Sequence, residues 1–261
     1  MSAPSKLKAA IFVVMVFTLM SVRQACAASG AYSEEAETLF RAGNEYYEQG
    51  DYARAREEYR KILEAGYESA NIYYNLGNAY FKAGDAARAV VSYERSKRLN
   101  PGDADLASNY KFVRANIETP LLSPRGIWNW RILKQYHEKF TVDVLFLMSS
   151  GVYAAAIVFL LAGVYSRRLT RRFVIIAVLL LVFAFSNLFI AFHAAGEIGT
   201  KAVVMMPETE SYYGPFDSAT VFFKLAKGIE VTVLKRNDDW CKIRRADGER
   251  GWVKAANLEI I

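Results

Sequence analysis

The chain has 261 residues, of which 53% are hydrophobic and 23% charged, so it is too apolar for a disordered chain and long enough for two or three modules. Its formal net charge of +6 divides into +3 for residues 1–27, −2 for 28–116, +4 for 117–200 and +1 for 201–261. Most of the excess lies beside apolar runs, so the composition argues against a nucleic-acid-binding face.

Few side chains in this sequence are suited to metal binding. The only cysteines are Cys26 and Cys241, and the only histidines are His137 and His193. No spacing such as C-x-x-C or H-E-x-x-H occurs, which argues against a zinc or haem protein. We therefore expect no metal and no cofactor.

The first 27 residues have the organisation of an export signal. Lys6 and Lys8 precede an apolar core over 9–20, and Ala25-Cys26-Ala27 supplies a small-x-small cleavage site. The alternative, an uncleaved membrane anchor, is disfavoured because the core is shorter than the roughly 20 residues that a span requires. Arg23, three positions before Cys26, argues against lipidation. Cleavage would leave Cys241 as the only thiol.

A repeat of 34 residues follows the leader. Identical residues recur at this spacing: Gly43 and Gly77, Tyr46 and Tyr80, Gly50 and Gly84, Asp51 and Asp85, Ala55 and Ala89, Tyr59 and Tyr93. Such a period is typical of stacked helical hairpins. The pattern predicts helices over 35–48, 52–65, 70–82 and 86–99, with a further helix over 104–116.

These residues resemble the tetratricopeptide repeat family over 34–116. The match consists of Leu39, Gly43, Tyr46, Ala55 and Tyr59 in the first unit and Tyr73, Leu76, Gly77, Tyr80, Ala89, Tyr93 and Pro101 in the second. Only half of a third unit is present. We expect residues 104–116 to be the capping helix that seals the stack.

The resemblance implies a concave face, lined by the first helix of each pair, that holds a peptide or a partner's helix. Carried over position by position, this face would present Phe40, Asn44, Tyr47, Tyr74, Asn75, Asn78, Phe81 and Phe112. A carboxylate clamp is doubtful, because Phe40, Asp105 and Asn109 stand where its cations would be. A partner surface and ordinary packing both remain compatible with this set, whereas Tyr46, Tyr59, Tyr80 and Tyr93 are expected to be packing residues.

Two long segments contain no charged residue, 144–166 and 173–196. At about 1.5 Å per residue each reaches roughly 35 Å, which is enough to cross the hydrocarbon core of a bilayer. Soluble core helices of this length and apolarity are uncommon. We therefore expect two transmembrane helices. An ion path through Asp143, Ser186, Asn187 and His193 is disfavoured against simple helix-to-helix bonding.

The short connection between these segments, 167–172, carries Arg167, Arg168, Arg171 and Arg172. Arginine clusters remain on the cytoplasmic side, so both flanking modules are expected across the membrane from it. The export signal independently leads to the same orientation. The stretch 117–143 then forms a linker whose Trp128, Trp130 and Tyr136 fit a membrane interface.

The last 60 residues have the alternation of short β-strands. We expect strands over 202–205, 220–225, 230–235, 240–244, 250–254 and 258–261, separated by glycine-rich or asparagine- and aspartate-rich turns. The order of Gly214-Pro215, Lys227-Gly228, Asp239-Trp240, Asp247-Gly248 and Gly251-Trp252-Val253 resembles the bacterial SH3-like domain over 201–261.

Four aromatic residues of this domain are candidates for a ligand surface: Tyr212, Tyr213, Trp240 and Trp252. The two tyrosines are the better candidates, since the tryptophans are more often core and turn anchors. Cys241 is expected to be a small buried hydrophobe rather than a nucleophile.

The expected fold class is thus multidomain: an α-solenoid of helical hairpins, two transmembrane helices and a small all-β SH3-like barrel. The order of these modules resembles the E-type proteins of the Bacteroides aerotolerance operon, the Bat proteins. That resemblance implies an inner-membrane protein with two periplasmic modules that assembles with von Willebrand A-type membrane proteins in envelope stress tolerance. A non-enzymatic scaffold is favoured, because no Ser/His/Asp or Cys/His grouping is evident. The alternative is a sensor or anchor that binds peptidoglycan through the barrel.

Overall fold

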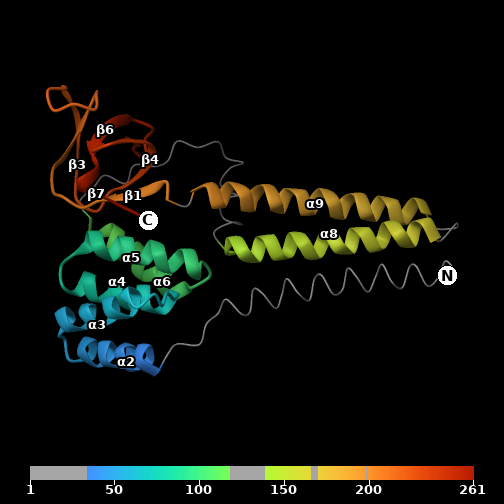
Figure 1. Cartoon of the computed structure of the whole chain (residues 1–261), viewed down its shortest axis with the longest axis horizontal. Helices are drawn as coiled ribbons and strands as arrows, with labels where there is room; N and C mark the ends of the chain where they lie inside the picture. Colours follow the sequence, from blue (N-terminus) through green and yellow to red (C-terminus); the bar gives the residue numbers. More distant parts are fainter. Residues whose placement is uncertain (1–33, 118–138, 166–169, 198) are drawn as a thin grey trace. The chain divides into compact units, whose positions relative to one another are not determined.

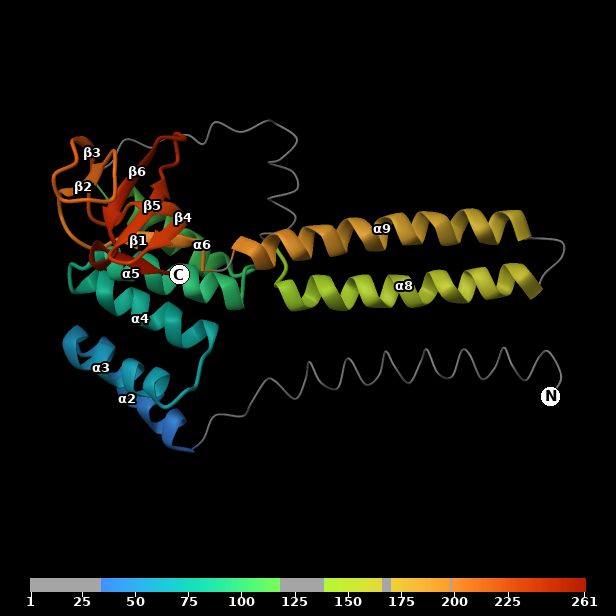
Figure 2. The ribbon, with the colours of Figure 1, turned by 45° about the horizontal axis from the view of Figure 1, so that its top comes forward.

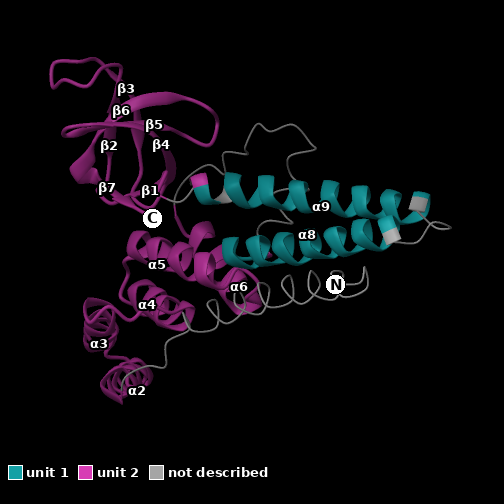
Figure 3. Ribbon diagram, turned by 45° about the vertical axis from the view of Figure 1, so that its right-hand side comes forward, with its two compact units in different colours: residues 1–31, 140–195 teal, residues 32–139, 196–261 magenta. Residues whose placement is uncertain are grey.

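The structure is a computed structural model that describes residues 34–117, 139–165, 170–197 and 199–261 (Figure 1). These residues fall into two compact units (Figure 3). The described residues from 140 to 195 belong to the first unit, and the second contains residues 34–117 and 139 together with those from 196 onward. The expected export signal and the aromatic residues Trp128, Trp130 and Tyr136 lie outside the described residues.

The first unit is a pair of long antiparallel helices, α8 (Val142–Tyr165) and α9 (Thr170–Glu197), which run side by side in Figures 1 and 2. Each contains a 23-residue stretch, with mean hydropathy of 2.3 in α8 and 2.9 in α9. Both helices are therefore long and apolar enough to cross a membrane.

Small side chains recur every seven residues on the buried sides of these two helices. They are Ser149, Ala156 and Gly163 in α8 and Ala177, Ala184 and Ala191 in α9. Phe159 of α8 contacts Phe173 of α9 with 6.0 Å between ring centroids. Small residues at this spacing allow two helices to approach closely, while large apolar side chains such as Phe185 and Phe192 face outward.

The helical part of the second unit consists of α2 (Glu34–Glu48), α3 (Tyr52–Glu64), α4 (Ala70–Lys82), α5 (Ala86–Leu99) and α6 (Ala104–Ala115). This confirms the expected stack of helical hairpins. Side chains cap the helix starts: Asp51, Ser69, Asp85 and Asp103 each accept a hydrogen bond from the backbone N–H three residues later. Gly50 and Gly84 turn the chain with φ of 79° and 84°.

Close packing within each hairpin explains two of the repeated glycines. A Cβ atom on Gly43 would lie 2.6 Å from the ring of Tyr59, and one on Gly77 would lie 2.6 Å from the ring of Tyr93. Both tyrosine rings are fully buried. The repeat therefore needs glycine where the first helix meets the tyrosine of the second.

The rest of the second unit is a seven-stranded antiparallel sheet. Its strands are β1 (Lys201–Val204), β2 (Thr209–Tyr212), β3 (Val221–Leu225), β4 (Glu230–Asn237), β5 (Trp240–Arg244), β6 (Arg250–Lys254) and β7 (Leu258–Ile260), in the order β3-β2-β6-β5-β4-β1-β7. Each pairing is antiparallel, as expected for a small SH3-like module. Its core contains Ala202, Val204, Leu225, Val231, Cys241, Ile243 and Val253.

Strand β2 was not expected from the sequence. Its inward-facing residues are Thr209 and Ser211, both buried. Because they are polar, the alternation of apolar and polar residues that indicates a strand is missing here. Gly251 on β6 leaves room for Ser211, since a Cβ at Gly251 would lie 2.0 Å from the Ser211 hydroxyl.

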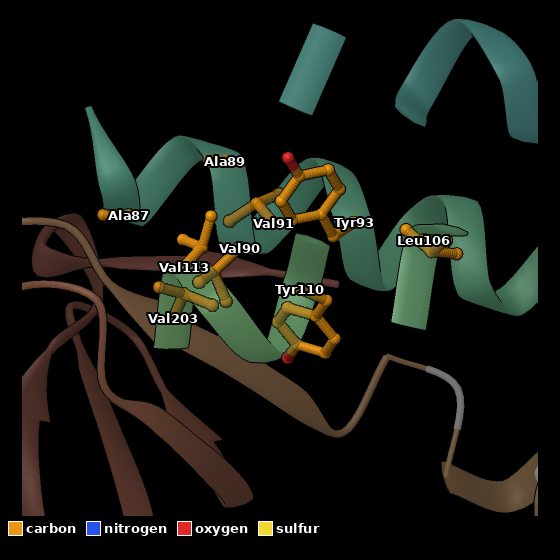
Figure 4. Packing of buried hydrophobic residues seen from close by; sticks show 9 residues of the cluster. All are labelled: Ala87, Ala89, Val90, Val91, Tyr93, Leu106, Tyr110, Val113 and Val203. Carbon is orange, nitrogen blue, oxygen red and sulfur yellow. The ribbon is translucent and has the colours of Figure 1, made fainter. Parts of the chain in front are cut away.

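Helices and sheet share one hydrophobic cluster within the second unit (Figure 4). Val203 of β1 is fully buried together with Val90 of α5 and Val113 of α6. Ion pairs surround this contact, including Arg95–Glu259 at 3.1 Å and Lys227–Asp85 at 3.0 Å. The sheet therefore covers the end of the helical stack.

Candidate partner-binding face

The first helices of the successive hairpins, α2, α4 and α6, contact one another through side chains. The Asn75 amide nitrogen of α4 donates to the Asn44 amide oxygen of α2 at 2.9 Å. Phe81 of α4 meets Phe112 of α6 edge to face, with 5.7 Å between centroids. We call the surface formed by these three helices the α2–α4–α6 face. The eight residues expected to bind a partner all lie on these helices.

Two asparagines at equivalent repeat positions, Asn44 and Asn78, accept the same pair of hydrogen bonds. Tyr59 donates its hydroxyl to the Asn44 amide oxygen at 2.7 Å, and Tyr93 donates to that of Asn78 at 2.6 Å. Each oxygen accepts a second bond from an asparagine of the next helix pair, from Asn75 and from Asn109 at 3.2 Å. Their amide nitrogens have no partner among the described residues, so both present N–H donors at this face.

The tyrosines that hold these amides stay protonated. Burial raises the pKa of Tyr59 to about 12, although the hydrogen bond with Asn75 acts in the opposite direction. Burial likewise raises the pKa of Tyr93. Both hydroxyls therefore remain hydrogen-bond donors at neutral pH and fix the orientation of Asn44 and Asn78.

The aromatic members of the face are partly accessible. Phe40 lies 5.9 Å from the Tyr59 ring and Tyr74 lies 6.2 Å from the Tyr93 ring, measured between centroids. Tyr47 contacts Tyr52, and burial together with nearby tyrosines raises its pKa. Phe112 is 61% exposed and contacts Phe81, so it adds accessible apolar surface to this face.

Asn109 belongs to the same network but was not among the residues expected to bind a partner. Its amide nitrogen donates to the Tyr74 hydroxyl at 2.8 Å as well as to Asn78. The sequence does contain a signal for it, because Asn109 follows Asn75 by the repeat length of 34 residues. The half repeat formed by α6 thus repeats the asparagine that the second complete repeat has at Asn75.

The four aromatic residues expected at the barrel surface separate into two groups. Tyr213 is 64% exposed, and its ring lies 4.4 Å from that of Phe222. Trp240, by contrast, is only 9% exposed, because the Tyr212 ring lies 5.4 Å away and the Lys254 ammonium 5.7 Å away. Trp240 is therefore a packing residue rather than a surface residue. Tyr212 and Trp252 are half-buried.

Exposed apolar residues next to Tyr213 extend this surface. Phe216 and Phe222, which we did not expect, are 56% and 37% exposed. Phe216 follows the Gly214-Pro215 turn, whereas Phe222 lies on the edge strand β3.

The other residues considered from the sequence are the arginines predicted to set the topology, the possible metal ligands and Cys241, and only two of the four arginines lie within the described residues. Arg171 and Arg172 are exposed in the first turn of α9, while Arg167 and Arg168 lie outside the described residues. Within the described part of the chain, no group of three or more His, Cys, Asp or Glu side chains could hold a metal ion. The Cys241 thiol is buried, which raises its pKa.

Comparison with known families agrees with the two modules of the second unit. Residues 40–104 match the tetratricopeptide repeat family, and residues 208–259 match the bacterial SH3 domain family. Both are typically interaction modules without catalytic activity. No curated protein matches the chain.

One similar solved structure is that of YrrB, described as a TPR protein with an unusual peptide-binding site. It is 22% identical, covers 62% of this chain and 74% of its own, and has a TM-score of 0.30. At this level the likeness carries no argument about the function of the present chain.

Proposed function

We propose that this protein is a non-enzymatic membrane scaffold that holds an extended segment of a partner protein along the α2–α4–α6 face. The observation that carries the proposal is the repeated arrangement at Asn44 and Asn78. Each amide oxygen accepts two internal hydrogen bonds, which leaves each amide nitrogen available as a donor to a partner.

The chemistry of the face favours a peptide backbone over an anionic group. Amide N–H donors complement backbone carbonyls, and the half-buried Phe40, Tyr74 and Phe81 offer apolar contacts between them. None of the eight residues predicted for the face is cationic, so a carboxylate or phosphate would have no opposite charge among them.

The fold supports a membrane hairpin. Helices and sheet of the second unit pack against each other, although α8 and α9 separate them in the chain. Two spans return the chain to the side of the membrane from which it came, which permits this contact, whereas a single span would not. With the arginine-rich connection in the cytoplasm, both modules lie outside it, in the periplasm of a bacterial cell.

The partner follows from the resemblance to the Bat proteins. We propose inner-membrane proteins with von Willebrand A-type domains, in a complex for envelope stress or aerotolerance. Such a partner shares the membrane with this chain, so α8 and α9 would keep the two proteins at a high effective concentration.

Crosslinking in native membranes, followed by identification of the captured proteins, tests the binding face. We expect the double variant Asn44→Ala and Asn78→Ala to reduce partner recovery about tenfold, since two hydrogen bonds are lost. Asn71→Ala is the matched control, because Asn71 is exposed on α4 and belongs to none of these bonds. Equal recovery from the double variant and the control would contradict the proposal.

A second candidate function rests on the exposed aromatic residues of the barrel. Tyr213, Phe216 and Phe222 form an accessible apolar surface that could bind peptidoglycan. Co-sedimentation of the full chain with purified sacculi tests this function. We expect Tyr213→Ala with Phe222→Ala to release the protein into the supernatant, and unchanged sedimentation would exclude this surface.

A further inference from the structure

Three ionisable side chains from different elements meet where the sheet covers the helical stack. Tyr110 of α6 lies with its hydroxyl 2.7 Å from the Glu94 carboxylate of α5. The same hydroxyl contacts the Glu230 carboxyl of β4. Tyr110 is 7% exposed and packs against Tyr93, so bulk water does not replace these contacts.

The contacts at the Tyr110 oxygen require more than the one proton of its hydroxyl. A tyrosine hydroxyl has one proton and can donate only one hydrogen bond, yet two carboxyl groups contact the Tyr110 oxygen. Both contacts are hydrogen bonds only if one carboxyl is protonated and donates to that oxygen. With both carboxylates charged, one contact would be a repulsive approach of two oxygens at a buried site.

The surrounding charges decide which carboxyl holds the proton. Burial raises the pKa of Glu94, but Lys201 and the Tyr110 hydroxyl outweigh it and leave that pKa below its usual value. Lys201 of β1 lies 3.8 Å from Glu94, and Lys97 of α5 acts in the same direction. Glu94 therefore remains charged.

Glu230 behaves in the opposite way. Burial and the charge of Glu94 raise its pKa. Arg114 of α6, 3.4 Å away, the Tyr110 hydroxyl and Lys201 all lower it, but together they offset this rise only in part. The Arg114 side chain is half exposed, which weakens its effect. Glu230 is thus the group that keeps a proton.

We propose that the sheet docks on the helical stack through one bound proton, which Glu230 donates to Tyr110 while Tyr110 donates to Glu94. Docking takes up this proton from water, and separation of the two modules returns it. Association of the barrel with the stack therefore responds to the acidity of the surrounding compartment.

The direction of the response follows from the two carboxyls. As the pH rises through the raised pKa of Glu230, the proton is lost, two like charges face each other, and docking weakens. In strong acid Glu94 becomes protonated, loses its attraction to Lys201, and docking weakens again. Docking is therefore strongest near the ordinary pKa of a glutamate, and it weakens from there toward the raised pKa of Glu230 and toward the lowered pKa of Glu94.

The test measures the docked fraction of the full chain in lipid nanodiscs. Single-molecule energy transfer is followed between fluorophores on the exposed positions of Lys82→Cys in α4 and Arg236→Cys in β4, with Cys26→Ser and Cys241→Ala as background. Over about pH 4 to 8, which brackets carboxyl titration, we expect the docked-to-undocked ratio to fall by up to about tenfold per pH unit on the alkaline side.

Two variants distinguish docking through the bound proton from docking through ordinary ion pairs. Glu230→Gln keeps a hydrogen-bond donor without a charge, so its docking should stay high and independent of pH on the alkaline side. Glu259→Gln removes the ion pair with Arg95 at the same contact. It should weaken docking but keep the wild-type dependence on pH.

Tyr110→Phe is the second test of the relay, and circular dichroism verifies that each variant is folded. Its docking should be weaker and should lose the steep dependence on pH. Wild-type docking that does not change with pH, or a wild-type slope in Glu230→Gln or in Tyr110→Phe, would overturn the proposal.

Discussion

The two complete repeats use the same residues at the same positions but in different surroundings. In both, a glycine receives a tyrosine ring, that tyrosine holds an asparagine, and an aspartate caps the second helix. In the first repeat, however, the second helix α3 has only three buried residues, Ala55, Tyr59 and Ile62. In the second, α5 has seven buried residues, because α6 and the sheet cover it.

This difference concerns how tightly the two repeats are packed, because the asparagine arrangement proposed for binding is the same in both. Among the residues that the structure describes, nothing packs on the outer side of the first repeat, so we expect movement of α2 to absorb changes there. The second repeat forms the junction between stack and sheet, so the same change there disturbs more neighbours. Equivalent substitutions in the two repeats should therefore reduce stability by different amounts. The difference measures how much the sheet stabilises the second repeat.

The largest difference in stability loss between the two repeats is expected for the buried tyrosines. Tyr93→Ala should cost about 3–5 kcal/mol of local stability, since Tyr93 packs against both Tyr74 and Tyr110. Tyr59→Ala should cost less, because α2 can move into the space that it leaves. Native-state hydrogen exchange of the α3 and α5 amides measures both values. Equal costs would show that the sheet does not constrain the second repeat.

A smaller difference in stability loss is expected for the glycines. Gly77→Ala should cost about 1–3 kcal/mol, since the new methyl group overlaps the Tyr93 ring, which cannot shift. Gly43→Ala introduces the same overlap with Tyr59, but displacement of α2 relieves part of it. Thermal unfolding of the two variants in the same detergent compares them. A larger loss for Gly43→Ala would contradict this account.

The smallest inequality is expected at the capping aspartates. Asp85→Ala removes a helix cap, for about 1 kcal/mol, and also the ion pair of Asp85 with Lys227 of the sheet. Asp51→Ala removes the equivalent cap, and Asp51 has no ion pair with the sheet among the described residues. Chemical unfolding distinguishes the two variants, and Lys227→Ala should abolish the difference. If the two variants still differ in a Lys227→Ala background, the larger loss for Asp85→Ala comes from its helix cap alone.

The sequence predicted most of the helical architecture because its signals are local. The repeat length, the glycines at the turns and the apolar run of each long helix act within one element or one pair of elements. The predicted helices over 70–82 and 86–99 coincide with α4 and α5. Strands with apolar alternation, such as β5 and β6, were equally accessible from the sequence.

Features that depend on distant pairings were not predicted. Strand β2 was missed because its inward residues Thr209 and Ser211 are polar. The buried position of Trp240 depends on Tyr212 and Lys254 from other strands. The docking of β1 on α5 and α6 was not anticipated, because the continuous apolar run around Val203 indicates burial but does not show which element covers the strand. The eight residues of the binding face were placed from repeat positions, and their role stays a prediction.

The junction between Val203 and the helical stack also has a consequence for biosynthesis. Val90 and Val113 emerge from the ribosome long before Val203, since at least a third of the chain lies between them and the sheet. Until the last module has been made, the end of the stack keeps an uncovered apolar surface. A truncated product that lacks the C-terminal strands would expose this surface permanently, and chaperones and proteases recognise such surfaces.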